Sequence, residues 1–289
     1  MSTVAVNDPV LTLTPEHTAS IGLAVNAMRS ESDYPFTIET LAEITNFSPF
    51  HFARLFRSLI GIPPGEFLTA LRYDRAKKLL LTSDLSVTDI CFEVGYDSLG
   101  TFSTRFKQLV GIGPAGFRAL PELMDAISSS PPSGSSAIGR ENGTAASIRG
   151  RIIDPPVGYN AYVGIFPASI ARGRPVAGTR ISAVEPFALT DLPRGQFRLL
   201  CAAVPAGNSQ TRHLLPGAEL QVASHPELIS IETGLEHFQL TLSMRALGPT
   251  DPPVLIALPT LDLHCPDVLS TVRPRDRQRA SNLLLAAGD

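Results

Sequence analysis

One arrangement of residues occurs twice, about fifty residues apart, and it constrains the fold more than any other feature of the chain. The first copy runs from Thr37 to Leu59 and the second from Ser86 to Leu109. In each copy a capping residue opens a short segment, a tight turn follows, and a second segment carries apolar residues at three- and four-residue steps. This spacing predicts helices. The sequence therefore predicts a domain that repeats a unit of helix, turn and helix.

The second helix of each copy has two unlike sides. Its large apolar residues share one face, which we expect to lie in the core: Phe52, Leu55, Phe56 and Leu59 in the first copy, and Phe102, Phe106 and Leu109 in the second. The opposite face is small, polar or basic. A helix of this kind keeps one face free for a partner.

Residues with special backbone roles mark the ends of these helices. Ser86 and Asp89 have the spacing of a capping box, in which each side chain accepts from a free backbone N–H of the first turn. Ser48 followed by Pro49 predicts a helix start. Gly95 is expected to end its helix with a positive φ.

The two copies together resemble the DNA-binding domain of AraC/XylS-type transcription regulators. The resemblance covers about eighty residues, under a third of the chain. It rests on the motif positions Leu41, Ala42, Phe47, Ser48, Pro49, Phe52, Leu55, Phe56, Arg57, Gly61, Pro64, Phe67, Leu71, Arg72, Ala76, Leu79, Leu80, Ser86, Asp89, Ile90, Val94, Gly95, Phe102, Phe106, Gly111, Pro114, Phe117 and Arg118.

The resemblance implies that double-stranded DNA is the partner and that the second helix of each copy enters a major groove. The base-reading residues that it implies are Phe50, Ala53 and Arg54 in the first copy, and Leu99, Gly100, Thr101 and Thr104 in the second. Arg54 suits a bidentate contact to guanine, and Phe50 suits a thymine methyl group. The spacing of Leu99 also suits the core, so both roles stay open for it. The second site is expected to be read mainly through methyl contacts and DNA shape.

Basic residues on the same helices suit the DNA backbone. We expect phosphate contacts from His51, Arg57, Arg105 and Lys107, with a solvated surface position as the alternative for each. The 289-residue chain has 24 basic and 27 acidic residues and a net charge of −3, so bulk charge cannot supply the attraction. Any DNA contact must come from groups placed locally.

Nothing in the sequence predicts catalysis, a metal or a cofactor. The cysteines Cys91, Cys201 and Cys265 are far apart and lack the spacing of a disulfide framework, a zinc site or the nucleophilic motif of DNA-alkylation-repair proteins. His213, His225, His237 and His264 are scattered, and we expect structural roles for them. The chain also lacks a predicted secretory signal or membrane segment, so we expect no membrane partner and a cytoplasmic protein, nucleoid-associated when bound to DNA.

The expected fold class is multidomain: an all-α double helix-turn-helix domain followed by an all-β sandwich. We assign residues 1–14 to a flexible arm, 15–120 to the helical domain, 121–147 to a Ser/Pro-rich linker, 148–270 to the sandwich and 271–289 to a tail or short helix. Strands are expected at Ser147 to Asp154, Tyr162 to Phe166, Phe197 to Val204, Phe238 to Met244 and Val254 to Leu258.

Two phrases of the second domain resemble the carboxypeptidase-regulatory-like, prealbumin-type sandwich, notably the Leu192-Pro193-Arg194-Gly195 turn between two apolar strands. The sequence as a whole favours a sequence-specific bacterial transcription regulator whose sandwich senses a small-molecule effector, binds a partner protein or forms a homodimer. The alternative is an adaptor recruited to DNA, whose sandwich binds a carbohydrate or a partner protein.

Overall fold

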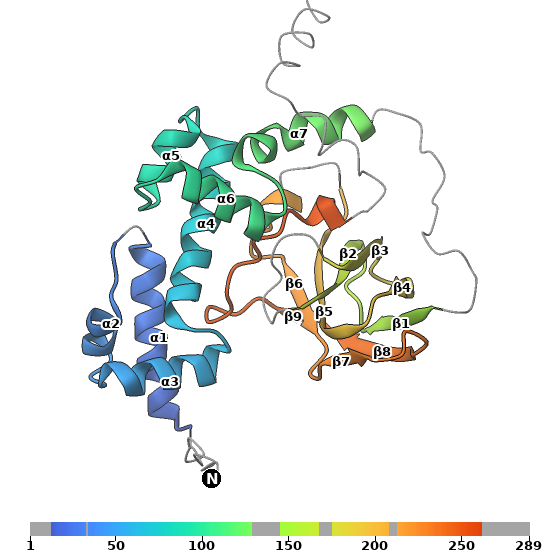
Figure 1. The fold of residues 1–289 in the computed structure, drawn as a ribbon, viewed down its shortest axis with the longest axis horizontal. Helices are drawn as coiled ribbons and strands as arrows, with labels where there is room; N and C mark the ends of the chain where they lie inside the picture. The colour runs from blue at the N-terminus through green and yellow to red at the C-terminus, as the bar shows by residue number, and fades with distance from the viewer. Residues whose placement is uncertain (1–12, 33, 129–144, 168–174, 208–212, 262–289) are drawn as a thin grey trace, which may run out of the picture. The chain divides into compact units, whose positions relative to one another are not determined.

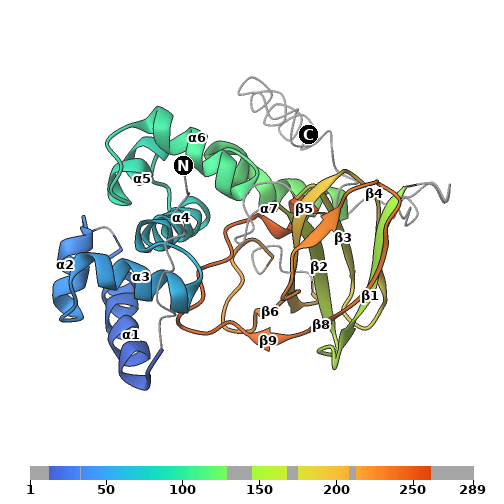
Figure 2. The ribbon, with the colours of Figure 1, turned by 60° about the horizontal axis from the view of Figure 1, so that its bottom comes forward.

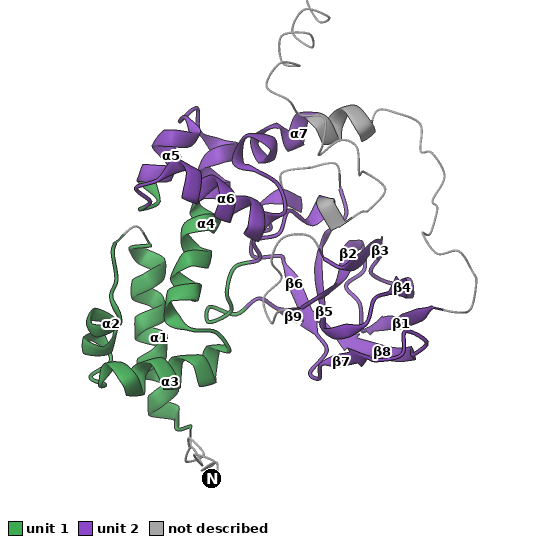
Figure 3. Cartoon of the chain, viewed as in Figure 1, with its two compact units in different colours: residues 1–75, 93–95, 248–253 green, residues 76–92, 96–247, 254–289 purple. Residues whose placement is uncertain are grey.

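The structure is a computed structural model, and it describes residues 13–32, 34–128, 145–167, 175–207 and 213–261. The chain divides into two compact units (Figure 3). The first contains residues 1–75, 93–95 and 248–253, and the second contains residues 76–92, 96–247 and 254–289. Residues 1–12 of the expected arm, and the whole of the tail expected at residues 271–289, lie outside the described residues. Of the helices in the described part of the chain, none is both long and apolar enough to cross a membrane.

Seven helices form the amino-terminal part of the described chain (Figure 1). They are α1 (Pro15–Ser30), α2 (Ile38–Ile44), α3 (Pro49–Ile60), α4 (Pro64–Thr82), α5 (Val87–Glu93), α6 (Leu99–Val110) and α7 (Pro114–Ser128). The helices α2 and α3 make the first predicted helix-turn-helix unit, and α5 and α6 make the second. The predicted duplication is therefore confirmed in the order and length of these elements.

The capping residues act as the sequence predicts. The Ser48 hydroxyl accepts from the backbone N–H of His51, and Ser98 plays the same part at the start of α6. Ser86 and Asp89 form their capping box, with the Asp89 N–H donating to Ser86 Oγ at 3.1 Å. Gly61 and Gly111 end α3 and α6 with φ values of 85° and 94°, a region that favours glycine. The predicted positive φ of Gly95 is also confirmed, at 80°.

Three phenylalanines pack in a row behind each second helix. In the first unit Phe56 lies between Phe52 and Phe67, at centroid distances of 5.6 and 5.7 Å. In the second unit Phe106 lies between Phe102 and Phe117, at 5.9 and 5.7 Å. All six rings are fully buried. Because Phe67 belongs to α4 and Phe117 to α7, each row joins a second helix to the helix that follows it. We call these rows the phenylalanine clamps.

Two arginines tie the connections between helices to the helical packing. Arg72 donates to the carbonyl oxygens of Ser32 and Tyr34, both at 3.0 Å, and so holds the connection between α1 and α2. Arg118 donates to the carbonyl oxygens of Leu80 and Leu85, at 3.0 and 2.6 Å, and so holds the connection between α4 and α5. Each guanidinium satisfies two main-chain acceptors that no helix ladder reaches.

The carboxy-terminal part is built from two sheets, which we call the β domain (residues 146–261; Figures 1 and 2). Its strands are β1 (Ala146–Ile153), β2 (Tyr159–Phe166), β3 (Ala177–Ser182), β4 (Phe187–Leu192), β5 (Gly195–Pro205), β6 (Gln221–Ser224), β7 (Ile229–Ile231), β8 (His237–Ser243) and β9 (Arg245–Ala246). One sheet has the order β4-β1-β8, and the other has the order β3-β2-β5-β6-β9, with β7 paired to β5.

The two sheets share one apolar core. Ile148 and Leu189 enter it from the first sheet, and Val163 and Leu199 enter it from the second. Within the sheets, β1 runs parallel to β8, and the other paired strands are antiparallel. The described β domain therefore has the two-layer arrangement of the expected fold class.

Two segments differ from the sequence-based expectation. The helix α7 continues through Pro121 to Ser128, into the range assigned to the linker. Phe117 and Leu120 are buried on this helix, and their packing outweighs the one backbone donor that proline lacks. The strand predicted at Val254 to Leu258 is wrong: this segment joins no sheet and leads into a 3₁₀ turn, η1 (Leu258–Leu261).

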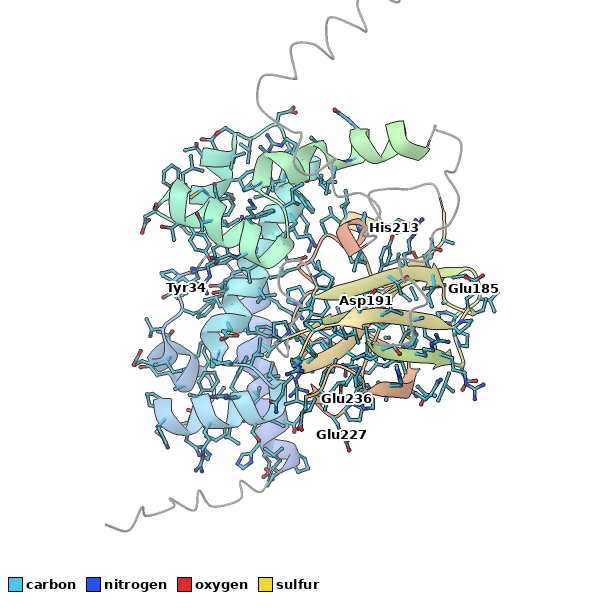
Figure 4. The ribbon with its side chains drawn as sticks, turned by 45° about the vertical axis from the view of Figure 1, so that its right-hand side comes forward. Tyr34, Glu185, Asp191, His213, Glu227 and Glu236 are labelled. Carbon is cyan, nitrogen blue, oxygen red and sulfur yellow. The ribbon has the colours of Figure 1, made fainter. Side chains whose placement is uncertain are left out.

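A carboxylate organises the turn between β7 and β8. Glu236 accepts from four successive backbone N–H groups, of Glu232, Thr233, Gly234 and Leu235, at 2.7 to 3.0 Å (Figure 4). These hydrogen bonds, first among them that of Thr233, lower the pKa of Glu236 from 4.5 to about 2.

Replacing Phe56 with alanine tests the clamp. We expect Phe56→Ala to lower the free energy of unfolding by about 3–5 kcal/mol, because a fully buried ring is lost between two others. Phe50 lies on the same helix with 77% of its surface exposed, so Phe50→Ala is the matched control and should leave stability nearly unchanged. Chemical denaturation measures both. Equal losses from the two variants would contradict the assignment of the two faces.

The turn at Glu236 predicts a dependence of stability on pH. Because folding lowers this pKa from 4.5 to about 2, the carboxylate stabilises the protein fully above pH 4.5, and the effect is lost as the pH falls towards 2. We expect Glu236→Gln to lower the melting temperature near neutral pH and to match the unmodified chain near pH 2. Glu227→Gln, at an exposed glutamate of the same domain, is the control (Figure 4). A difference that stays constant over this range would refute the role of the turn.

Candidate nucleic-acid interface

The helices α3 and α6 carry the residues predicted to contact DNA bases, and we call them the reading helices. The first, α3, exposes part of its predicted residue set. Phe50 is 77% exposed, in the first turn of the helix. Ala53 and Arg54 are half-buried, one turn further along. Arg57, predicted to contact phosphate, is exposed in the last turn. The helix thus offers the Phe50 ring and the Arg57 guanidinium to solvent, whereas the Nε of Arg54 is buried.

His51 has a packing role that the sequence did not reveal. Its ring lies edge-on to Phe47 at 5.1 Å and to His17 at 5.9 Å, and His17 in turn contacts Phe47 at 5.8 Å. His17 lies on α1, so this group of rings joins α1 to the start of α3. His51 remains half-buried, and its predicted phosphate contact stays a prediction.

The turn before α3 fixes where the helix begins. Asn46 has a φ of 56°, a left-handed conformation that asparagine tolerates better than most residues. Thr45 is buried and donates its hydroxyl to the carbonyl oxygens of Leu41 and Ala42, at 3.2 and 3.0 Å. The Thr45 side chain therefore satisfies carbonyl groups at the end of α2, where the chain turns towards α3.

The second reading helix, α6, exposes its whole predicted set. Leu99 is 40% exposed, so the structure does not place it in the core. The other exposed members are Gly100, Thr101, Thr104, Arg105 and Lys107. This face is chemically different from that of α3, because hydroxyl and methyl groups replace the aromatic ring and the central arginine. Its long side chains, Arg105 and Lys107, lie in the second half of the helix, beyond Thr104.

The described cysteines are not placed for nucleophilic chemistry. Cys91 and Cys201 are free thiols and buried. Burial raises the pKa of Cys201 to about 12, and it also raises the pKa of Cys91, where Asp97 adds to the effect. A thiol with a raised pKa carries little thiolate at neutral pH and is a poor nucleophile. Cys265 lies outside the described residues.

Two described histidines of the β domain have structural partners, whereas the Nδ1 of His225 is buried without a hydrogen-bond partner. His213 is buried and bonds through Nδ1 to the hydroxyl of Tyr162 at 2.7 Å, and burial, followed by the charge of Arg180, lowers its pKa (Figure 4). His237 bonds to the hydroxyl of Ser147 at 2.9 Å. No group of three or more His, Cys, Asp or Glu in the described ranges is arranged to hold a metal ion. His264 falls outside them.

Sequence comparison matches residues 41–119 to the family described as "Helix-turn-helix domain". One relative is the HTH-type transcriptional activator AarP of Providencia stuartii, 34% identical over 82 residues, which are 28% of this chain and 61% of that protein. Another is the HTH-type transcriptional regulator AlkR of Acinetobacter baylyi, 33% identical over 112 residues, which are 39% of this chain and 37% of that protein.

A third relative combines two activities. It is the bifunctional transcriptional activator/DNA repair enzyme AdaA of Bacillus subtilis, 36% identical over 87 residues, or 30% of this chain and 41% of that protein. The similarity to these three relatives covers between 37% and 61% of their lengths.

Similar solved structures include the DNA-binding domain of AdpA in complex with a target DNA, at 31% identity and a TM-score of 0.35, covering 37% of this chain and 96% of that one. An AraC-type regulator from Chromobacterium violaceum is 25% identical with a TM-score of 0.33, and the match covers 37% of this chain and 95% of that one. Residues 41–119, which the family model matches, begin within α2, contain α3 to α6 and end within α7. Residues 41–119 of this chain carry an AraC-type helix-turn-helix domain.

Proposed function

We propose that this protein is a sequence-specific, DNA-binding transcription regulator. The observation that carries the proposal is the repeated construction of α3 and α6. Each helix is capped at Ser48 or Ser98, ended by a left-handed glycine, and clamped by three buried phenylalanines on one side. Each leaves the other side to solvent. A rigid helix with a free face is what major-groove recognition requires.

Two such helices in one chain can read two adjacent segments of DNA. Major-groove faces on one side of the duplex recur after roughly 34 Å, or about 10 base pairs. We infer that α3 reads one segment through Phe50, Ala53 and Arg54. We infer that α6 reads the next through Leu99, Gly100, Thr101 and Thr104, with a larger share of methyl contacts and DNA shape. His51, Arg57, Arg105 and Lys107 would contact phosphates.

We assign the β domain to regulation. It is joined to the DNA-binding domain in one chain and has a core of its own, so it suits the binding of a small-molecule effector, a partner protein or a second copy of the chain. We assign it no catalytic role, in keeping with the buried thiol of Cys201. With DNA as its partner, the protein would act in the cytoplasm, at the nucleoid.

Arg54→Ala tests base reading by α3. We expect a loss of about 1–3 kcal/mol in discrimination at one base position, since a bidentate contact to guanine is removed. The measurement is the relative affinity for a set of duplexes that differ by single base pairs. Arg57→Ala on the same helix is the matched control and should weaken all duplexes alike. If the base preference of Arg54→Ala equals that of the unmodified chain, Arg54 does not read a base.

Lys107→Ala tests the phosphate contact of α6. We expect weaker binding to every duplex and a plot of log affinity against log salt that is shallower by about 1 unit, because one fewer counterion is released. Arg149→Ala, at an exposed arginine of the β domain, controls for the loss of one positive charge. A loss confined to particular sequences would contradict a phosphate role.

A further inference from the structure

The segment that follows β9 is buried although it pairs with no strand. We call residues 247–258 the strap. Ile256 and Leu258 are 2% and 1% exposed, and Leu255 and Ala257 are buried as well. A buried segment outside any sheet must find partners for its backbone N–H and C=O groups elsewhere. Those partners show what the strap joins.

One side of the strap covers a sheet of the β domain. Its side chains Leu247, Val254, Ile256 and Leu258 form an apolar cluster with Tyr162 and Phe166 of β2 and with Ala202 and Val204 of β5. Alternate residues of the same strands, among them Val163 and Ala203, point into the main core between the sheets. Side chains alternate across a strand, so the strap lies on the outer face of the second sheet.

The backbone of the strap is bonded to helices of the second compact unit. Lys77 of α4 is fully buried and donates its ammonium to the carbonyl oxygen of Val254 at 3.0 Å. Its Nζ lies 5.8 Å from the ring centre of Phe117, a member of the phenylalanine clamp. The N–H of Ala257 donates to the carbonyl oxygen of Val110 at 3.1 Å. Val110 is the last residue of α6.

Within the first compact unit, the strap meets α1. Arg29 donates to the carbonyl oxygens of Pro249 and Asp251, at 2.8 and 2.7 Å. Its guanidinium also lies 5.6 Å above the ring of Phe67, which belongs to the other phenylalanine clamp. Charged donors to neutral carbonyl groups are among the stronger hydrogen bonds.

We propose that the strap couples the state of the β domain to DNA reading by α6. The proposal rests on the function proposed above. The side chains of the strap are part of the β domain, whereas its backbone holds the end of α6 and a lysine beside the clamp of α6. A change at the outer sheet face that releases the strap therefore removes the hydrogen bond that Ala257 donates to the last residue of α6, and it leaves Lys77 of α4 without its acceptor at Val254. By linkage, DNA bound at α6 favours the docked strap to the same extent.

Amide hydrogen exchange of the full chain tests whether the strap is held against the β domain and the end of α6. The Ala257 amide should exchange as slowly as amides of β2 and β5, because its N–H is held by Val110. We expect Ile256→Ala to speed exchange at Ala257 by about ten-fold or more while β2 and β5 stay protected, as packing on the sheet is lost. Ile153→Ala, at an isoleucine of β1 with 42% exposure, is the matched control. An Ala257 amide that exchanges like an unstructured chain would overturn the proposal.

DNA affinity of the same variants tests the coupling. With a duplex selected by the unmodified chain, Ile256→Ala should bind at least about three-fold more weakly, and Ile153→Ala should not. Lys77→Met removes the donor to Val254 and leaves the sheet unchanged. We expect it to weaken DNA binding as Ile256→Ala does. It therefore tests the coupling even if Ile256→Ala unfolds the β domain. Faster exchange at Ala257 with unchanged affinity overturns the coupling. If the unmodified chain selects no duplex, the proposed function fails, and exchange at Ala257 still decides whether the strap docks.

Discussion

The helix-turn-helix domain depends on the row of phenylalanines behind α3 and the matching row behind α6. A helix of 12 residues, such as α3 or α6, is marginal on its own in water and gains its stability from packing of its apolar face. Phe56 and Phe106 supply that packing by filling the space between a neighbour on their own helix and one on the next. Serine caps and left-handed glycines then fix where each helix starts and ends. The opposite face of each helix does not contribute to the phenylalanine clamp.

The two copies keep the same phenylalanine clamp and differ in what they expose. At matching places the first copy carries Phe50 and Arg54, and the second carries Gly100 and Thr104. None of these four residues belongs to a phenylalanine clamp, so the packing of the clamps does not determine them. A chain with a net charge of −3 cannot hold DNA by overall attraction, so its affinity must come from these few local groups. This difference between the faces predicts an asymmetric binding site, with a first half read through hydrogen bonds and a second half read largely through shape.

The helical part could be predicted closely because the residues that cap helices and the spacing of the buried residues indicate the same helices. The pairs Ser86 with Asp89 and Ser48 with Pro49 mark helix starts, and the phenylalanine spacing marks the buried faces. Sequence reasoning failed at Val254 to Leu258, which reads as a strand. Its alternating apolar residues do pack on one side, as in a strand, but its backbone groups bond to Lys77 and Val110. The periodicity of a sequence indicates which side chains are buried, but it does not indicate which groups form hydrogen bonds with the backbone. For the same reason the contacts of His51 with Phe47 and His17 could not be foreseen, because they join residues from different helices.

The central claim is that two reading helices in one chain recognise adjacent segments of DNA. Selection of bound sequences from a random pool of duplex DNA by the full chain tests it most directly. The account predicts an asymmetric motif of two short blocks whose centres are about one helical turn, or roughly 10 base pairs, apart. Selection of no motif, or of a single block that fits one reading helix, would contradict it.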